Sequence, residues 1–148
     1  DEEMSKFIGE FVVKHRIQVL KPFTGALETL SELHRRGIAL ALVTNGEKIS
    51  QRGKIDRVGL SSFFDSITVE GEFGVGKPSR EIFERALNTI KSRPGDSWMV
   101  GDDLAKDIAG ASACGMFTVW VDSRRKGLPP ESVPTPNRIV QTIVELLE

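Results

Sequence analysis

The chain has 148 residues, of which 39% are hydrophobic and 28% are charged, and its formal net charge is −1. This length and composition fit one folded domain and exclude a disordered or fibrous chain. The near-equal numbers of basic and acidic side chains, 20 and 21, argue against nucleic acid as a main partner. A single cysteine, Cys114, excludes an intrachain disulfide.

The apolar segments are too short to cross a membrane. The longest fully apolar run is Ile38–Val43, whereas a membrane-spanning helix needs about 20 such residues. The N-terminus carries no signal-peptide pattern, so we expect a cytoplasmic domain without a membrane partner. The chain begins Asp1-Glu2-Glu3-Met4 rather than with methionine, which we interpret as a cut end.

Helix and strand patterns alternate along the chain. Apolar residues at helical spacing predict helices over residues 3–15 and 24–36, the second with Thr24 as its N-cap. The run Ile38–Val43 predicts a strand buried on both faces of a parallel sheet. Further strands are predicted at 67–69, 98–100, 117–121 and 138–140, and helices at 47–58, 79–91, 104–114 and up to Leu147. This alternation indicates βαβ units.

Ligands of open α/β sheets bind at the carboxyl ends of the strands, so the residues that follow each strand are the candidates for chemistry. Thr44-Asn45-Gly46 follow the first predicted strand, and Lys77 ends the segment after the second. Hydroxyl, N–H and ammonium donors of this kind are what a phosphate group needs. Each residue also has a structural interpretation, because Asn-Gly is a common turn pair and a single lysine often lies on the surface.

Acidic residues follow the third predicted strand. Asp102 and Asp103 come directly after it, and Asp107 lies one helical turn further on. Mg²⁺ prefers a few carboxylate oxygens and keeps several waters, which suits Asp102 and Asp107. Asp102 and Asp103 also fit a purely structural role as helix caps.

Taken in order, these motifs resemble those of the haloacid dehalogenase superfamily of phosphohydrolases, over roughly residues 22–122. Val43–Gly46 resembles its second motif, Gly76–Pro78 its third, and Gly101–Asp103 with Asp107–Ala111 its fourth. The resemblance is closest to the subfamily with a helical cap. It implies a Rossmann-like three-layer α/β/α fold around a parallel sheet, with residues 1–20 as a remnant of the cap and 21–148 as the core.

The resemblance also implies a role for each candidate. Thr44 and Lys77 are catalytic and hold the transferring phosphoryl group, with Asn45 and Gly46 beside them in the phosphate site. The metal is Mg²⁺, bound by Asp102 and supported by Asp107, with Asp103 as a further candidate. The implied reaction is hydrolysis of a small phosphorylated metabolite through an aspartyl-phosphate.

The superfamily's first motif, a strand ending in Asp-x-Asp that supplies the nucleophile, does not occur in this sequence. We therefore expect the first strand and most of the helical cap to be missing, and the chain to be a truncated, inactive form. That strand would be central in the sheet, so its loss leaves a gap. We expect a homodimer or an exchanged segment to fill the gap, with residues 3–20 as the best local candidates, because Ile17–Leu20 could pair as a short strand.

Two other functions stay open. One is a non-catalytic member of the same fold that serves as a binding or interaction module. The other is a P-loop nucleotide binder, because Gly71–Lys77 fits the first seven positions of G-x-x-x-x-G-K-[ST]. In that pattern Pro78 replaces the hydroxyl residue that binds magnesium, and it lacks the N–H that faces the phosphates.

Overall fold

The structure, a computed structural model, describes residues 4, 16–131 and 134–148. The helix predicted over residues 3–15 lies, apart from Met4, outside the described residues. Within the described ranges no helix is long and apolar enough to cross a membrane. The helices and strands are α2 (Ala26–Arg35), β1 (Ala41–Thr44), α3 (Lys48–Arg57), β2 (Ser66–Val69), α4 (Glu70–Phe73), α5 (Arg80–Thr89), β3 (Trp98–Gly101), α6 (Ala109–Ala113), β4 (Phe117–Val121) and β5 (Arg138–Val140).

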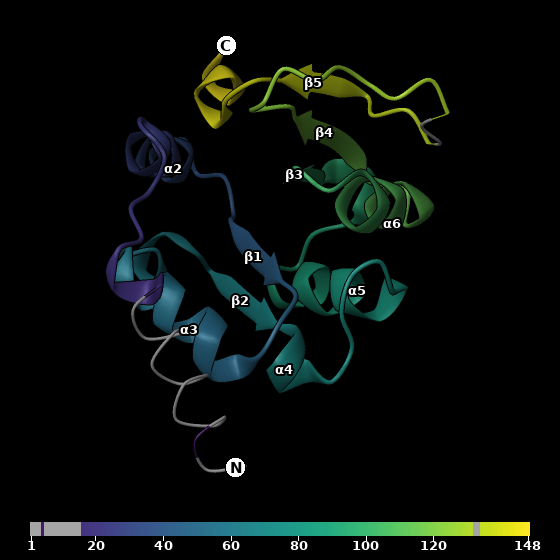
Figure 1. Cartoon of the computed structure of the whole chain (residues 1–148). Coiled ribbons are helices and arrows are strands. Elements are labelled where there is room, and N and C mark those ends of the chain that lie inside the picture. Colours follow the sequence, from purple (N-terminus) through teal and green to yellow (C-terminus); the bar gives the residue numbers. More distant parts are fainter. Residues whose placement is uncertain (1–3, 5–15, 132–133) are drawn as a thin grey trace.

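The strands form two separate sheets in which every pair is parallel. β1 pairs with β2, from Ala41 opposite Ser66 to Thr44 opposite Val69. The other sheet has the order β3–β4–β5. In Figure 1, α3 lies on one side of β1 and β2, α5 lies on their other side, and α6 lies next to β3 and β4. The predicted α/β class with Rossmann-like parallel strands is therefore confirmed.

The core forms where α5 packs against the strands and α6. The apolar residues of α5 pack against Ala111 and Cys114. Val43 and Met99, which are partly buried, pack against the same cluster. The buried residues of α5 are Ile82, Phe83, Ala86 and Leu87. Because this helix is fixed by its buried face, it also fixes the loop before it, which carries Lys77.

The first strand differs from its prediction in both bounds and burial. β1 begins at Ala41 rather than Ile38, because Leu40 is bound by Asp65 instead. The Leu40 N–H donates to Asp65 Oδ2 over 2.8 Å, and the Asp65 N–H donates to Leu40 O over 2.8 Å. The prediction of burial on both faces was wrong, since Ile38 is 45% exposed and every residue of β1 is only half-buried.

Two helices also begin differently from their predictions. The N-cap of α2 is Gly25, with a φ of 79°, and not Thr24. Glycine fits there for steric reasons too, because a Cβ would lie 2.6 Å from the Val144 side chain. The predicted helix 104–114 starts with a π-helical turn over Leu104–Ile108 and continues as α6. Two successive N–H groups at the end of this turn donate to the Asp103 carbonyl, which widens it.

Candidate functional site

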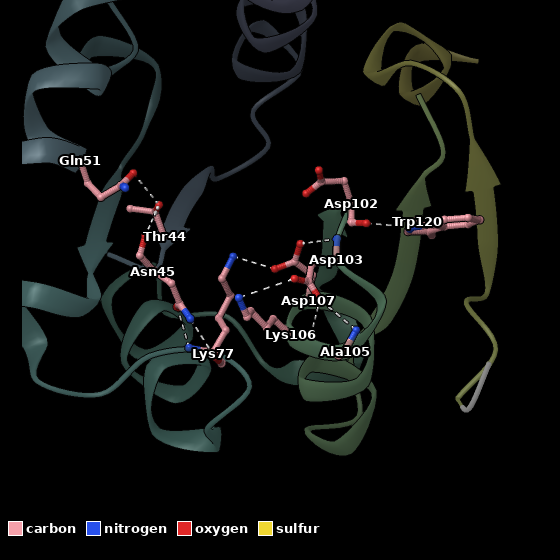
Figure 2. Close-up of polar contacts among 10 residues, drawn as sticks. All are labelled: Thr44, Asn45, Gln51, Lys77, Asp102, Asp103, Ala105, Lys106, Asp107 and Trp120. Atoms are coloured by element: carbon pink, nitrogen blue, oxygen red, sulfur yellow. Dashed lines mark hydrogen bonds and ion pairs between the residues drawn. The ribbon is translucent and has the colours of Figure 1, made fainter. Parts of the chain in front are cut away.

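The candidate site lies where β1 and β3 end, and Figure 2 shows its side chains. Thr44 is the last residue of β1, and Asp102 directly follows β3. Lys77 comes from the loop between α4 and α5, and its side chain extends toward Asp107. The structure thus brings Lys77 and Asp107 into contact, and it places Thr44 and Asp102 at the carboxyl ends of β1 and β3, where ligands of α/β folds bind.

Lys77 and Asp107 form a buried ion pair. Lys77 Nζ lies 2.6 Å from Asp107 Oδ1, and the two side chains are 12% and 6% exposed. The Asp103 N–H donates to Asp107 Oδ2 over 3.1 Å. Asp107 Oδ1 is buried, and its partner among the described residues is the Lys77 ammonium. Gly101 makes room for this carboxylate, because a Cβ at that position would overlap it.

Asp102 and Asp103 have different surroundings. Asp103 caps the following turn, since its Oδ1 accepts hydrogen bonds from the N–H groups of Ala105 and Lys106 at 3.0 and 2.9 Å. The Asp102 side chain is not buried, and Figure 2 shows no contact of its carboxylate with the other residues drawn. Its backbone carbonyl accepts a hydrogen bond of 2.9 Å from Trp120 Nε1, which fixes the end of β3. Asp102 therefore offers a ligand oxygen more readily than Asp103 does.

Asp102 and Asp107 are the carboxylates of the site that could hold a divalent cation. Within residues 4, 16–131 and 134–148, no group of three or more His, Cys, Asp or Glu side chains is placed to hold a metal ion. Two carboxylates, one exposed and one buried in an ion pair with Lys77, would suit Mg²⁺, which takes oxygen ligands and usually keeps several waters. Zinc needs three or four protein ligands and fits less well.

The Asn45 carboxamide fixes the backbone of Lys77. Asn45 Nδ2 donates to the Lys77 carbonyl over 2.8 Å, and the Lys77 N–H donates to Asn45 Oδ1 over 2.7 Å. The sequence predicts Asn45 as a phosphate ligand, and in the structure its carboxamide binds this peptide unit. The two bonds join the loop after β1 to the loop before α5. They therefore set the position from which the Lys77 ammonium extends.

Glu70 holds the same loop and was missing from the predicted site. Its Oε2 accepts a hydrogen bond of 2.8 Å from the N–H of Gly46, the group predicted to face a phosphate. Gly76 lies against the Glu70 carboxylate, since a Cβ there would come within 2.5 Å of Glu70 Cδ. Glu70 is the first residue after β2. The strand-end rule that selects Thr44 would therefore have selected Glu70 as well.

Gln51 is a second residue of the site that the sequence does not predict. Thr44 Oγ1 donates to Gln51 Oε1 over 3.1 Å. On the same helix, the Arg52 guanidinium donates to both carboxylate oxygens of Glu72, at 2.8 and 2.7 Å, and these bonds lower the pKa of Glu72. Both contacts depend on how α3 lies against β1 and α4, for which the local sequence carries no signal.

Comparison with known proteins identifies the family. A family model described as haloacid dehalogenase-like hydrolase matches residues 1–121. The chain is 42% identical over 105 residues to the phosphoserine phosphatase of Thermus thermophilus, a match that covers 71% of this chain and 42% of that protein. It is 40% identical over 118 residues to the N-acylneuraminate-9-phosphatase of Rattus norvegicus, covering 79% and 47%. The chain belongs to the haloacid dehalogenase-like hydrolase family.

Solved structures agree with this assignment. A phosphatase of the same family from Thermococcus onnurineus has a TM-score of 0.76 and 31% identity, and the match covers 84% of this chain and 55% of that one. A putative beta-phosphoglucomutase from Thermotoga maritima has a TM-score of 0.83 at 20% identity, covering 99% and 68%, which supports the fold alone. The resemblance stated from the motifs is confirmed. The chain spans about half the length of the curated relatives it matches.

Proposed function

We propose that Thr44, Lys77, Asp102 and Asp107 form the phosphate and Mg²⁺ site of a phosphohydrolase that acts on small phosphate monoesters. The observation that carries this proposal is the buried Lys77–Asp107 ion pair at the ends of β1 and β3. The two curated relatives named above are phosphatases whose names give different substrates, phosphoserine and N-acylneuraminate 9-phosphate. They support the class of small phosphorylated metabolites and do not favour one member of it.

Each residue contributes one chemical property. The Thr44 hydroxyl, which donates to Gln51 in this structure, is able to rotate and donate to a phosphate oxygen. The Lys77 ammonium supplies positive charge, and its ion pair with Asp107 holds it in place. Asp102 and Asp107 would hold Mg²⁺, which when bound neutralises charge on phosphate oxygens.

The 148 residues contain no Asp-x-Asp, the motif to which the family resemblance assigns the nucleophile. We therefore propose that this polypeptide on its own binds phosphate and Mg²⁺ without turnover, because binding groups alone do not replace a covalent nucleophile. The single cysteine, which leaves no intrachain disulfide, supports a cytoplasmic location.

Calorimetric titration with MgCl₂ tests the metal site. Asp102→Asn is expected to weaken Mg²⁺ binding at least about tenfold, because it removes a charged ligand. Asp96→Asn is the matched control, since Asp96 is an exposed aspartate near the opposite end of the same strand, and it should leave the affinity unchanged. Equal Mg²⁺ affinity in wild type and Asp102→Asn would place the metal elsewhere and refute the proposed site.

Titration with inorganic phosphate and an activity assay test the anion site and the lack of turnover. Lys77→Met is expected to abolish phosphate binding in the presence of Mg²⁺, because it removes the ammonium. The wild-type chain should release no phosphate from an aryl phosphate above the rate of the buffer. Turnover that disappears in Asp102→Asn would contradict the proposed need for a missing nucleophile. Phosphate binding that survives Lys77→Met would contradict the site itself.

A further inference from the structure

Two groups of the predicted phosphate site are already bound within the structure. The Asn45 carboxamide is held by the peptide unit of Lys77. The Gly46 N–H donates to Glu70 Oε2 over 2.8 Å. The Thr44 hydroxyl differs from both groups, because it rotates and carries a single proton. The direction of that proton therefore decides whether Thr44 can donate to a phosphate.

In this structure the Thr44 hydroxyl is turned toward helix α3. Its Oγ1 donates to Gln51 Oε1 over 3.1 Å, and a second acceptor, the Asn45 carbonyl, lies at 3.4 Å (Figure 2). Both distances exceed about 2.8 Å, the usual length of a hydroxyl hydrogen bond, so the proton is weakly held. A phosphate dianion offers only acceptor oxygens. Thr44 must therefore release Gln51 before it can donate to the phosphate.

This release brings two acceptors face to face. Once the Thr44 proton is on a phosphate oxygen, Oγ1 and Gln51 Oε1 present only lone pairs to each other, which is unfavourable. A carboxamide carries a donor nitrogen beside its acceptor oxygen, and a half-turn of its terminal bond exchanges the two. After that turn Gln51 Nε2 would donate to Thr44 Oγ1, while Thr44 donates to the phosphate. The two side chains would then be hydrogen-bonded both with and without the ligand.

The Gln51 carboxamide has room for this turn. Gln51 is half-buried, and among the described residues its Nε2 donates no hydrogen bond. Nε2 lies against Gly46, where a Cβ would come within 2.7 Å of it. Gly46 has a φ of 119°, a conformation that favours glycine, and it leaves this space open.

The first half of α3 is fixed against the neighbouring elements, and this holds Gln51 in place. The Arg52 guanidinium donates to both carboxylate oxygens of Glu72 on α4, at 2.8 and 2.7 Å. The Gly71 N–H of α4 donates to the Gly46 carbonyl over 3.0 Å, which joins α4 to the loop before α3. Gln51 therefore faces Thr44 because of how the helix is mounted.

The second half of α3 is covered by residues 17–20. The Arg57 guanidinium donates to the Gln18 carbonyl at 3.1 and 3.0 Å. The Ile17 side chain lies against Gly53, where a Cβ would come within 2.9 Å of it. The sequence predicts Ile17–Leu20 as a short strand in the gap, and this prediction was wrong, because the segment packs on α3 instead.

We propose that Gln51 is a positioning residue for phosphate, whose carboxamide changes from acceptor to donor toward Thr44 when the anion binds. This turn directs the Thr44 hydroxyl to the phosphate and keeps it there. The inference rests on the proposed function, since it takes phosphate as the ligand of Thr44. It assigns a role to a side chain of α3 that does not itself touch the ligand.

Titration with inorganic phosphate at saturating MgCl₂ compares two variants of Gln51. An ionised glutamate has the shape of glutamine but only acceptor oxygens, so Gln51→Glu should hold the Thr44 proton and weaken phosphate binding at least about tenfold. Gln51→Met removes acceptor and donor together and should weaken it by no more than about threefold. A merely structural contact predicts the reverse order, because glutamate keeps the hydrogen bond with Thr44 and methionine loses it.

Thr44→Val separates this hydrogen bond from charge repulsion. In that background Gln51→Glu still adds a negative charge but has no hydroxyl to hold. Its effect on the phosphate affinity should then be at least about fivefold smaller than in the wild-type background. Gln18→Glu is the matched control, because Gln18 is exposed beside the far end of α3, and it should leave the affinity unchanged.

NMR of the wild-type chain observes the turn directly. The side-chain amide signals of Gln51 are identified by their loss in Gln51→Met. At phosphate saturation one of them should move downfield, because Nε2 gains Thr44 Oγ1 as an acceptor. The same signal should stay in place in Thr44→Val and in Lys77→Met, which is expected not to bind phosphate. Should Thr44→Val fail to fold, the wild-type and Lys77→Met spectra still decide the question.

Two results would overturn this inference and leave the proposed function standing. The first is phosphate binding that depends on Lys77 but is equally strong in Gln51→Glu and Gln51→Met. The second is a Gln51 side-chain amide whose signals do not move at phosphate saturation. A wild-type chain that binds no phosphate would overturn the proposed function, and this inference with it.

Discussion

Replacing Asp107 or Lys77 measures how strongly their ion pair holds the site together. In Asp107→Asn, the Lys77 ammonium loses the carboxylate 2.6 Å away while only 12% of its side chain is exposed. Breaking a buried ion pair by removing one partner costs about 3–5 kcal/mol, because the other charge is left uncompensated. Lys77 and Asp107 line an open cavity of about 820 Å³ between β1 and β3, so we expect the low end of this range, about 3 kcal/mol. A domain stability of about 5–15 kcal/mol makes this a large fraction.

Urea unfolding of a double-mutant cycle gives the coupling free energy between the two side chains. The cycle consists of wild type, Lys77→Met, Asp107→Asn and the double variant. The hydrogen bond from the Asp103 N–H to Asp107 cancels in this cycle, because the change of the carboxylate to an amide is made both with and without the lysine. We expect a coupling of at least about 1 kcal/mol for this contacting pair.

The Arg80–Glu84 pair is the matched control for the cycle. Its two charged atoms are also 2.6 Å apart, but the side chains are 67% and 49% exposed. Exposed helical pairs of this kind contribute about 0.3–0.5 kcal/mol, so burial is the main difference between the two pairs. A Lys77–Asp107 coupling no larger than that of Arg80–Glu84 would refute the argument that this pair is stabilised by its burial.

Three further predictions concern packing, pH and the cysteine. Gly110→Ala should lower the free energy of unfolding by about 1–3 kcal/mol, because the new Cβ would lie 2.7 Å from the Phe83 ring. Gly95→Ala is the control and should change this free energy by less than about 0.5 kcal/mol, because a Cβ at Gly95 meets nothing within 4 Å. Equal urea midpoints for the two variants would contradict the prediction. Hydrogen bonds from Arg35 and Arg36 lower the pKa of Glu32 from 4.5 to about 2. The contribution of the ionised Glu32 to the free energy of unfolding is therefore present above pH 4.5 and is lost as the pH falls toward 2. An NMR titration midpoint of 4.5 for Glu32 would contradict this. Burial raises the pKa of the Cys114 thiol. Ellman's reagent at neutral pH should therefore react far more slowly with the native protein than with the urea-unfolded protein. Equal rates would contradict the burial of Cys114.

The sequence predicts well those helices and strands in which apolar residues recur at the spacing of a helix or a strand. The strands Phe117–Val121 and Arg138–Val140 have the predicted bounds. The apolar stripe predicted for residues 79–91 is the buried face of α5. In these segments the side chains that face the core are set by neighbouring residues in the chain. A local pattern is then enough to place the element.

The sequence does not predict contacts that join distant loops. Asn45 and Lys77 are 32 positions apart, and the two hydrogen bonds between them depend on the packing of β1 and α5 together. Gly25 is the N-cap of α2, and a side chain at this position would clash with Val144 near the other end of the chain. The exposure of Ile38 does not follow from its apolar neighbours either, because Ile38 lines the open cavity between β1 and β3, and burial there depends on distant parts of the fold.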